Sequence, residues 1–139
     1  KRMMEKLGGV KGRRVTVWGL AFKAHTDDIR ESAGIEIAQR LHAAGADLVV
    51  YDPQAMGNAR QVLSDHVEFA PTAMDAATGS EVLVVLTEWP EFRGVSFSTL
   101  KERMLEPNIF DGRNHLADLN LESHGFHYHG IGLGTYASA

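Results

Sequence analysis

Three short segments of the sequence combine turn-forming and charged residues, and each of them follows an apolar run. They are the first loop (Leu20–Glu31), the second loop (Thr87–Gly94) and the third loop (Asp111–Asn114). The first loop carries Lys23 and Arg30, and the third loop carries Arg113. Ammonium and guanidinium groups bind phosphate oxygens, and a guanidinium can do so through two parallel hydrogen bonds. These residues therefore suit the binding of a phosphorylated small molecule.

Both loops also admit a simpler interpretation. The charges of the first loop could pair with each other in a solvated loop, and Arg113 could lie on a surface turn. The first loop also lacks the Gly-x-Gly-x-x-Gly pattern, because Phe22 and Lys23 follow Gly19 where close backbone approach needs glycine. A dinucleotide pyrophosphate lying directly on this turn is therefore not expected, whereas side-chain binding of phosphate remains open.

The elements that position these loops begin with two apolar, β-branched runs. Val15–Gly19 and Asp47–Tyr51 predict parallel strands that helices cover on both faces. Between them, Ser32–Ala44 has apolar residues at helical spacing, with Ser32 as the predicted N-cap and Gly45 at the end. Together these segments predict a strand–helix–strand unit with a right-handed crossover.

The alternation continues along the rest of the chain. Further helices are predicted at Gln54–Ser64, Thr72–Thr78 and Val95–Arg103, and strands at Val67–Phe69, Val82–Leu86, Pro107–Phe110 and Phe126–Tyr128. This pattern predicts an α/β fold with a three-layer, doubly wound, mainly parallel, Rossmann-like sheet in a single domain. Ligands of such sheets bind beyond the carboxyl ends of the strands, where the first loop, the second loop (Thr87–Gly94) and the third loop should meet.

Composition limits the classes of function. The 139 residues carry a net charge of -4 without a long basic run, which argues against nucleic acid or an anionic membrane as the main partner. No apolar stretch approaches the roughly 20 residues that span a bilayer, and no signal-peptide pattern opens the chain, so we expect a cytoplasmic location. Cysteine is absent, which excludes disulfides, thiolate metal sites and a cysteine nucleophile in these residues.

The order of residues in the first loop is more specific than its charge. Gly19-Leu-Ala-Phe-Lys23, followed by Thr26-Asp-Asp-Ile-Arg30-Glu-Ser32, resembles the signature of the UDP-glucose/GDP-mannose dehydrogenase family. The resemblance implies that Lys23 contacts a bound nucleotide sugar and that Phe22 lines the same site. It also implies that Arg30 reaches toward NAD held by another domain.

Two other segments agree with this resemblance. Asp111-Gly-Arg113 is similar to a family segment whose arginine binds the nucleotide diphosphate, which implies that role for Arg113. Trp89 and Phe92 belong to a Thr-Glu-Trp-x-x-Phe segment that is also similar to the family, and we interpret both as packing residues. Asp52 follows the second strand, where a Rossmann domain binds ribose, but without the matching glycines it is predicted to stabilise the turn or cap the next helix.

The histidines near the end of the chain invite a metal interpretation. His127 and His129 would share one face of a strand, but no third ligand has suitable spacing, so no metal is predicted. We expect both rings, and that of His124, to be solvated or packed. Leu133 stands where the family has a basic residue, so any contact from that position is missing here.

The resemblance implies that the chain is part of a larger NAD-dependent enzyme. Residues 1–10 would end a linker helix from a missing N-terminal NAD-binding domain, and residues 11–139 would form the UDP-sugar-binding C-terminal domain. The family oxidises the primary alcohol of the sugar to a carboxylate with two NAD molecules, using a cysteine of the other domain. The resemblance thus implies UDP-glucose as substrate, a homodimer through the linker helix, and no catalytic residue or activity in this fragment alone.

Two alternatives stay open. The domain could belong to a sibling enzyme that oxidises a UDP-N-acetylhexosamine or GDP-mannose. It could also be a non-catalytic, flavodoxin-like binding or regulatory module, because Asp27, Asp28 and Asp52 offer acids like those of a phosphoacceptor domain. That second alternative leaves the cationic loops unexplained.

Overall fold

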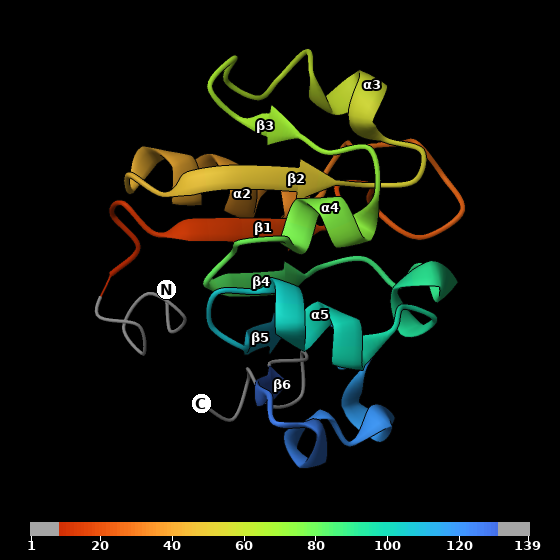
Figure 1. Cartoon of the computed structure of the whole chain (residues 1–139). Helices are drawn as coiled ribbons and strands as arrows, with labels where there is room; N and C mark the ends of the chain where they lie inside the picture. Colours follow the sequence, from red (N-terminus) through yellow and green to blue (C-terminus); the bar gives the residue numbers. More distant parts are fainter. Residues whose placement is uncertain (1–8, 131–139) are drawn as a thin grey trace, which may run out of the picture.

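The computed structural model describes residues 9–130. These residues form one parallel sheet with helices on both faces (Figure 1). The strands are β1 (Arg14–Trp18), β2 (Asp47–Tyr51), β3 (Glu68–Phe69), β4 (Val82–Val85), β5 (Asn108–Asp111) and β6 (His127–Gly130). Their order is β3-β2-β1-β4-β5-β6, and every pairing is parallel. The predicted doubly wound, Rossmann-like fold is confirmed, with no antiparallel strand among the described residues.

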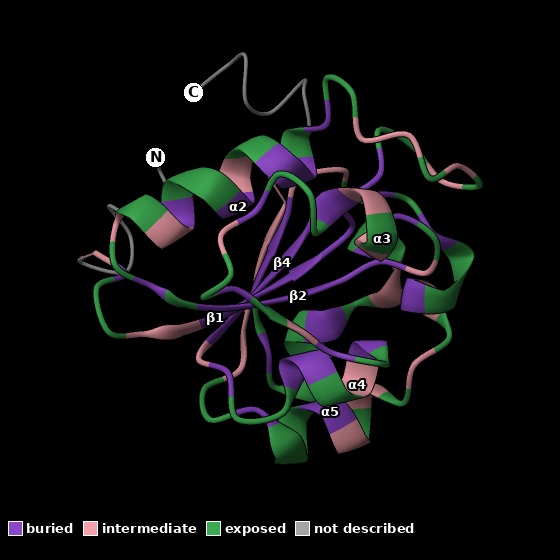
Figure 2. Cartoon of the chain, turned by 90° about the horizontal axis from the view of Figure 1, so that it is seen from above, coloured by how far each residue is buried: buried purple, intermediate pink, exposed green. Residues whose placement is uncertain are grey.

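The helices form the two outer layers of the domain. They are α2 (Ala33–Ala43), α3 (Met56–Ala59), α4 (Ala73–Ala77) and α5 (Phe97–Arg103), with 3-10 helices η1 (Pro90–Arg93), η2 (Ala117–Leu119) and η3 (Leu121–His124). Figure 2 shows α2 on one side of the sheet and α4 with α5 on the other. All four residues of β4 are buried, as expected for a strand covered on both faces.

The central strand β1 is tied to its covering helix by side-chain hydrogen bonds. Thr16 Oγ1 donates to the carbonyl oxygen of Ala76 at 2.6 Å, and Trp18 Nε1 donates to that of Ala73 at 3.0 Å. Both side chains are fully buried, so these bonds satisfy polar atoms that water does not reach. They fix α4 along β1.

The helix after the first loop begins and ends as predicted. Ser32 caps α2, since its Oγ accepts a hydrogen bond from the Ile35 amide at 3.2 Å and donates to the Leu20 carbonyl at 2.7 Å. Gly45 has a positive φ of 94°, which lets the chain turn out of the helix into β2. The cap therefore connects the start of α2 directly to the end of β1.

The predicted helix over Gln54–Ser64 is wrong in extent. Only α3 is helical there, and residues 60–62 form a turn that is followed by a bend at residue 63. Gly57 and Asn58 are poor helix formers, and Ala55 at the N-cap provides no side-chain hydrogen bond to the first turn. The other predicted elements exist, with ends that shift by one or a few residues.

Two glycines allow close contacts at the end of β1, one with α2 and one with the second loop. A Cβ atom on Gly34 would overlap the carbonyl oxygen of Gly19, and one on Gly19 would lie 2.6 Å from the Thr87 amide nitrogen. Gly19 also has a φ of 108°, which an L side chain rarely adopts. The domain therefore keeps a close contact between strand and helix although it lacks the glycine pattern of a dinucleotide-binding turn.

The buried carboxylate of Asp52, just after β2, receives five N–H donors. Its Oδ1 accepts from the amides of Gln54 and Ala55, which fixes the turn before α3. Its Oδ2 accepts from the amides of Leu20 and Ala21 and from the Trp89 indole, at 2.8, 3.0 and 3.1 Å. The predicted role in the turn is confirmed, and the carboxylate also joins the first and second loops.

We predict that Asp52→Asn lowers the free energy of unfolding by about 2 kcal/mol or more, since at least two donors then face an amide NH₂ group that cannot accept. Urea unfolding of this chain measures the change. Asp47→Asn is the matched control, because the Asp47 carboxylate is 59% exposed and pairs with Arg14 at the surface; its cost should stay below about 1 kcal/mol. Equal effects of the two substitutions would contradict the role assigned to Asp52.

Candidate functional site

The three loops meet at the carboxyl edge of the sheet. From β1 the chain builds β2 and β3 on one side and then β4, β5 and β6 on the other, so the order reverses between β1 and β4. The Thr87 hydroxyl donates to the carbonyl of Ala21 at 3.0 Å, and Arg113 Nε donates to that of Leu86 at 3.2 Å. The first and third loops are thus attached to adjacent residues at the switch point, where ligands of such sheets bind.

Lys23 and Phe22 lie at the exposed start of the first loop. The Phe22 amide donates to the carbonyl of Asp28 at 2.6 Å, which closes the loop on itself. The Phe22 side chain is nevertheless 41% exposed. Lys23 is also exposed, and its ammonium has no hydrogen bond or ion pair to any residue between 9 and 130. The loop therefore presents an aromatic ring and an unpaired cation side by side in sequence.

Arg113 is half-buried, and its backbone and side chain are both anchored. Its amide donates to Asp111 Oδ1 at 3.1 Å, while its Nε donates to the Leu86 carbonyl. Within the described part of the chain, no group accepts from its two Nη atoms. A guanidinium held in this way can offer two N–H groups to a phosphate at little further cost in side-chain entropy.

Arg30 is placed differently from Lys23 and Arg113. Its Nε and Nη2 donate to the two oxygens of Asp28 at 3.0 and 2.8 Å, and these bonds lower the pKa of the Asp28 carboxyl to about 2. The Arg30 side chain is 87% exposed. The local pairing considered from the sequence is therefore present for Arg30, and the pair stays ionised at neutral pH.

A hollow separates Arg30 from α3. It has a volume of about 540 Å³ and lies between the segment Thr26–Arg30 and the residues Asn58, Gln61 and Val62. Asn58 Nδ2 donates to the carbonyl of Asp27 at 2.8 Å and so attaches this segment to α3. The first loop is thus attached at Ala21 to the second loop and at Asp27 to α3.

The aromatic residues of the second loop are packing residues, as predicted. Phe92 is fully buried and stacks on Trp18 with ring centroids 5.0 Å apart. Trp89 is 5% exposed and meets the ring of His25 edge-on at 5.4 Å. Trp89 therefore packs against the first loop, whereas Phe92 packs against β1 and β2.

Sequence reasoning missed two residues that support Arg113. The buried Asp111 carboxylate accepts from the amides of Arg113 and Leu116 and from the Tyr128 hydroxyl. An aspartate between an apolar run and a glycine is a turn signal that could have identified Asp111. Tyr128 had no such signal, because its partner lies 17 residues away in the sequence.

The histidines near the end of the chain are exposed or packed, as expected, with His124 and His127 exposed. His129 stacks on Phe110 with centroids 4.6 Å apart, and residues 9–130 contain no group of three or more side chains suited to hold a metal. Leu133 and most of the expected linker-helix end, residues 1–8, lie outside the described residues. No helix in the described part is long and apolar enough to cross a membrane.

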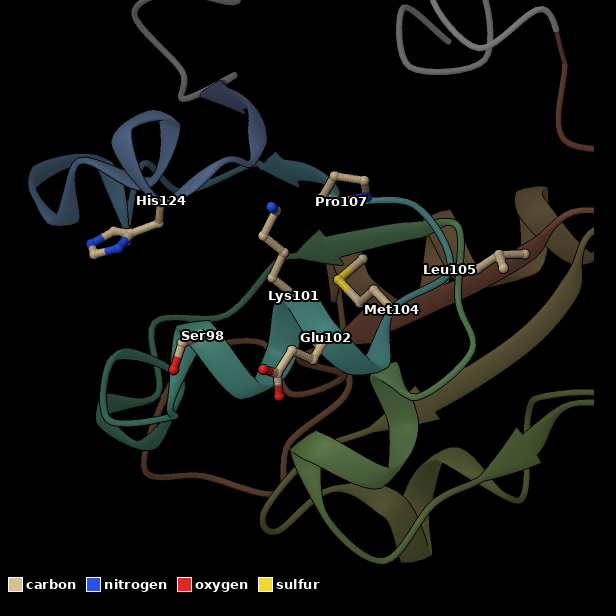
Figure 3. Close-up of a pocket in the computed structure, with 7 residues that line it drawn as sticks. All are labelled: Ser98, Lys101, Glu102, Met104, Leu105, Pro107 and His124. Atoms are coloured by element: carbon tan, nitrogen blue, oxygen red, sulfur yellow. The ribbon is translucent and has the colours of Figure 1, made fainter.

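A second hollow lies at the other end of the strands. Figure 3 shows its lining residues around the end of α5 and the start of β5, among them Lys101, Leu105, Pro107 and His124. Its volume is about 490 Å³. Because the hollow is at the amino ends of the strands, it is remote from the edge where Lys23 and Arg113 lie.

The chain matches one protein family over most of its length. The family model of the UDP-glucose/GDP-mannose dehydrogenase family, UDP binding domain, matches residues 16–118. A UDP-glucose 6-dehydrogenase of Rhizobium meliloti is 40% identical over 90% of this chain and 28% of its own length. One of Bacillus subtilis, YwqF, is 37% identical over 94% of this chain and 30% of its own.

Solved structures of nucleotide-sugar dehydrogenases superpose on this chain. A UDP-glucose dehydrogenase from Pyrobaculum islandicum superposes with a TM-score of 0.77 at 35% identity, covering 94% of this chain and 28% of the other. A UDP-D-ManNAc dehydrogenase from Pyrococcus horikoshii superposes with a TM-score of 0.74 at 26% identity, covering 96% and 29%. The chain thus spans less than a third of the length of these relatives. It belongs to the UDP-glucose/GDP-mannose dehydrogenase family and forms the UDP-binding domain of that family.

Proposed function

We propose that this chain is the nucleotide-sugar-binding domain of an NAD-dependent UDP-glucose 6-dehydrogenase. The observation that carries the proposal is the pair of cations at the switch point. The loops of Lys23 and Arg113 are attached to the adjacent residues Leu86 and Thr87, and neither the Lys23 ammonium nor the Arg113 Nη groups have a partner among the described residues. Two cations with unused donors suit a diphosphate, which carries negative charge on both phosphoryl groups.

In this proposal the domain contributes binding and positioning. Lys23 and Arg113 hold the diphosphate, Phe22 lines the same site, and the sugar is directed toward a second domain. That N-terminal domain is proposed to hold NAD and the catalytic cysteine, since this chain contains neither cysteine nor a glycine-rich dinucleotide turn. The full protein is proposed to be a cytoplasmic homodimer.

Among the described residues, Arg30 suits a single contact with NAD, and no glycine-rich turn is present that would form a complete NAD site. Arg30 is exposed beside a hollow, and Asp28 holds its guanidinium through two of its nitrogens. We propose that Arg30 contacts the NAD bound by the other domain. NAD bound there would supply the hydride acceptor, and Arg30, held in place by Asp28, would offer its remaining N–H groups to the cofactor.

For Arg113→Ala, we predict that the Kd of this chain for UDP rises about 10- to 100-fold, as expected for the loss of hydrogen bonds to a charged group. Isothermal titration with UDP measures this change, and KM for UDP-glucose measures it in the full-length enzyme. Arg40→Ala is the matched control, because Arg40 is an exposed arginine on α2 that pairs with Glu36. An unchanged Kd and an unchanged KM would remove Arg113 from the site.

For Arg30→Ala in the full-length enzyme, we predict a KM for NAD that rises about 10-fold while KM for UDP-glucose stays within about twofold. The reason is that Arg30 lines the hollow beside α3, whose lining includes no residue of the third loop. Steady-state titrations of each substrate at saturating levels of the other give both values. An unaltered NAD titration would contradict the assignment.

We also predict that the isolated chain forms no NADH from UDP-glucose and NAD. The proposed oxidation needs a cysteine nucleophile, and this chain has none. Absorbance of NADH is the measurement, with the full-length enzyme as the positive control. NADH formation by the isolated chain would show that its own residues catalyse the reaction.

A sibling activity is the second candidate. The similarity to a UDP-D-ManNAc dehydrogenase structure supports an N-acetylated UDP-sugar, and GDP-mannose is a further possibility within the family. Product analysis of the full-length enzyme with each nucleotide sugar distinguishes these substrates. A phosphoacceptor module is disfavoured, because Asp52 is buried and its carboxylate is saturated by N–H donors.

A further inference from the structure

One buried carboxylate holds the turn that carries Arg113. Asp111 is the last residue of β5 and is fully buried. Its Oδ1 accepts from the Arg113 amide at 3.1 Å, and its Oδ2 accepts from the Leu116 amide at 2.7 Å. Both ends of the turn are thus attached to the same side chain, so its orientation sets the position of the Arg113 backbone.

The third donor to this carboxylate comes from the edge strand β6. The Tyr128 hydroxyl donates to Asp111 Oδ2 at 2.9 Å. Burial, and then the nearby Asp111 carboxylate, raise the pKa of the Tyr128 phenol above its usual range. The phenol therefore remains a hydrogen-bond donor through neutral and alkaline pH.

The end of β6 packs directly against the same turn. A Cβ atom on Gly130 would overlap the side-chain oxygen of Asn114, which follows Arg113 with a left-handed φ of 53°. The same Cβ atom would lie 3.3 Å from the Tyr128 hydroxyl oxygen. β6 thus supports the turn by close packing as well as by the hydrogen bond from Tyr128.

We propose that Tyr128 is a positioning residue for the nucleotide diphosphate. It acts through Asp111 and fixes the turn so that the Nη groups of Arg113 face the ligand. This inference rests on the proposed function of Arg113. The edge strand β6, which carries Tyr128, thereby contributes to ligand binding without touching the ligand.

The test is a double-mutant cycle with UDP as the probe. Tyr128→Phe keeps the ring, removes one hydroxyl, and should raise the Kd for UDP about fivefold to tenfold. In the Arg113→Ala background the same substitution should leave Kd unchanged, because Tyr128 acts only through Arg113. Tyr51→Phe is the matched control, since it removes a similar hydroxyl bond, to Glu91 at 2.8 Å, on another strand.

Two outcomes overturn the inference while the role of Arg113 stands. One is an unchanged Kd in Tyr128→Phe, and the other is equal weakening by Tyr128→Phe in both backgrounds, which would indicate a general structural effect. If Arg113→Ala itself leaves UDP binding intact, the proposed role of Arg113 fails and the inference fails with it.

A second measurement needs no ligand. In a ¹H–¹⁵N spectrum of the chain, the Nε–H signal of Arg113 should shift or broaden in Tyr128→Phe and stay in place in Tyr51→Phe. In the full-length enzyme, Tyr128→Phe should raise KM for the nucleotide sugar and leave kcat within about twofold. A changed kcat with constant KM, or an unaltered Nε–H signal, contradicts the inference.

Discussion

The carboxylate of Asp52 is the constraint on which the binding edge depends. A fully buried carboxylate is tolerated only when hydrogen bonds replace its lost hydration, and five N–H groups do so here. Three of those donors belong to the first and second loops. Because this one buried charge must be hydrogen-bonded, the loops that follow β1, β2 and β4 meet at Asp52. The backbone before Lys23 is held there through the amides of Leu20 and Ala21.

Asp111 repeats this arrangement at the end of β5. Its carboxylate also collects donors from outside its own strand, namely the amide of Leu116 and the hydroxyl of Tyr128. The two acids thus hold the loops that carry Lys23 and Arg113, through the amides of Leu20 and Ala21 and through that of Arg113. Asp111 accepts from the Arg113 amide and not from its guanidinium, whose Nε donates instead to the Leu86 carbonyl.

The sequence predicted the parts of the molecule that depend on local pattern. Continuous apolar runs identified β1, β2 and β4, and Ser32 identified the start of α2. Periodicity alone failed for α3, because Gly57 and an uncapped start outweigh it. Contacts between residues far apart in sequence were invisible, which is why the support of Arg113 by Tyr128 and the attachment of the first loop to α3 appeared only in three dimensions.

The contact between Gly19 and Gly34 has a consequence for how such a domain can change its ligand. The start of α2 is pressed against the end of β1, and Ser32 accepts from the amides of Ile35 and Glu36, so these two amides are not available to a phosphate. In the proposed function, anions are bound instead by long side chains on loops whose backbone is held by Asp52 and Asp111. In that case a single substitution of such a side chain can change the ligand that the domain binds. The path of the main chain and the packing of α2 on β1 stay the same.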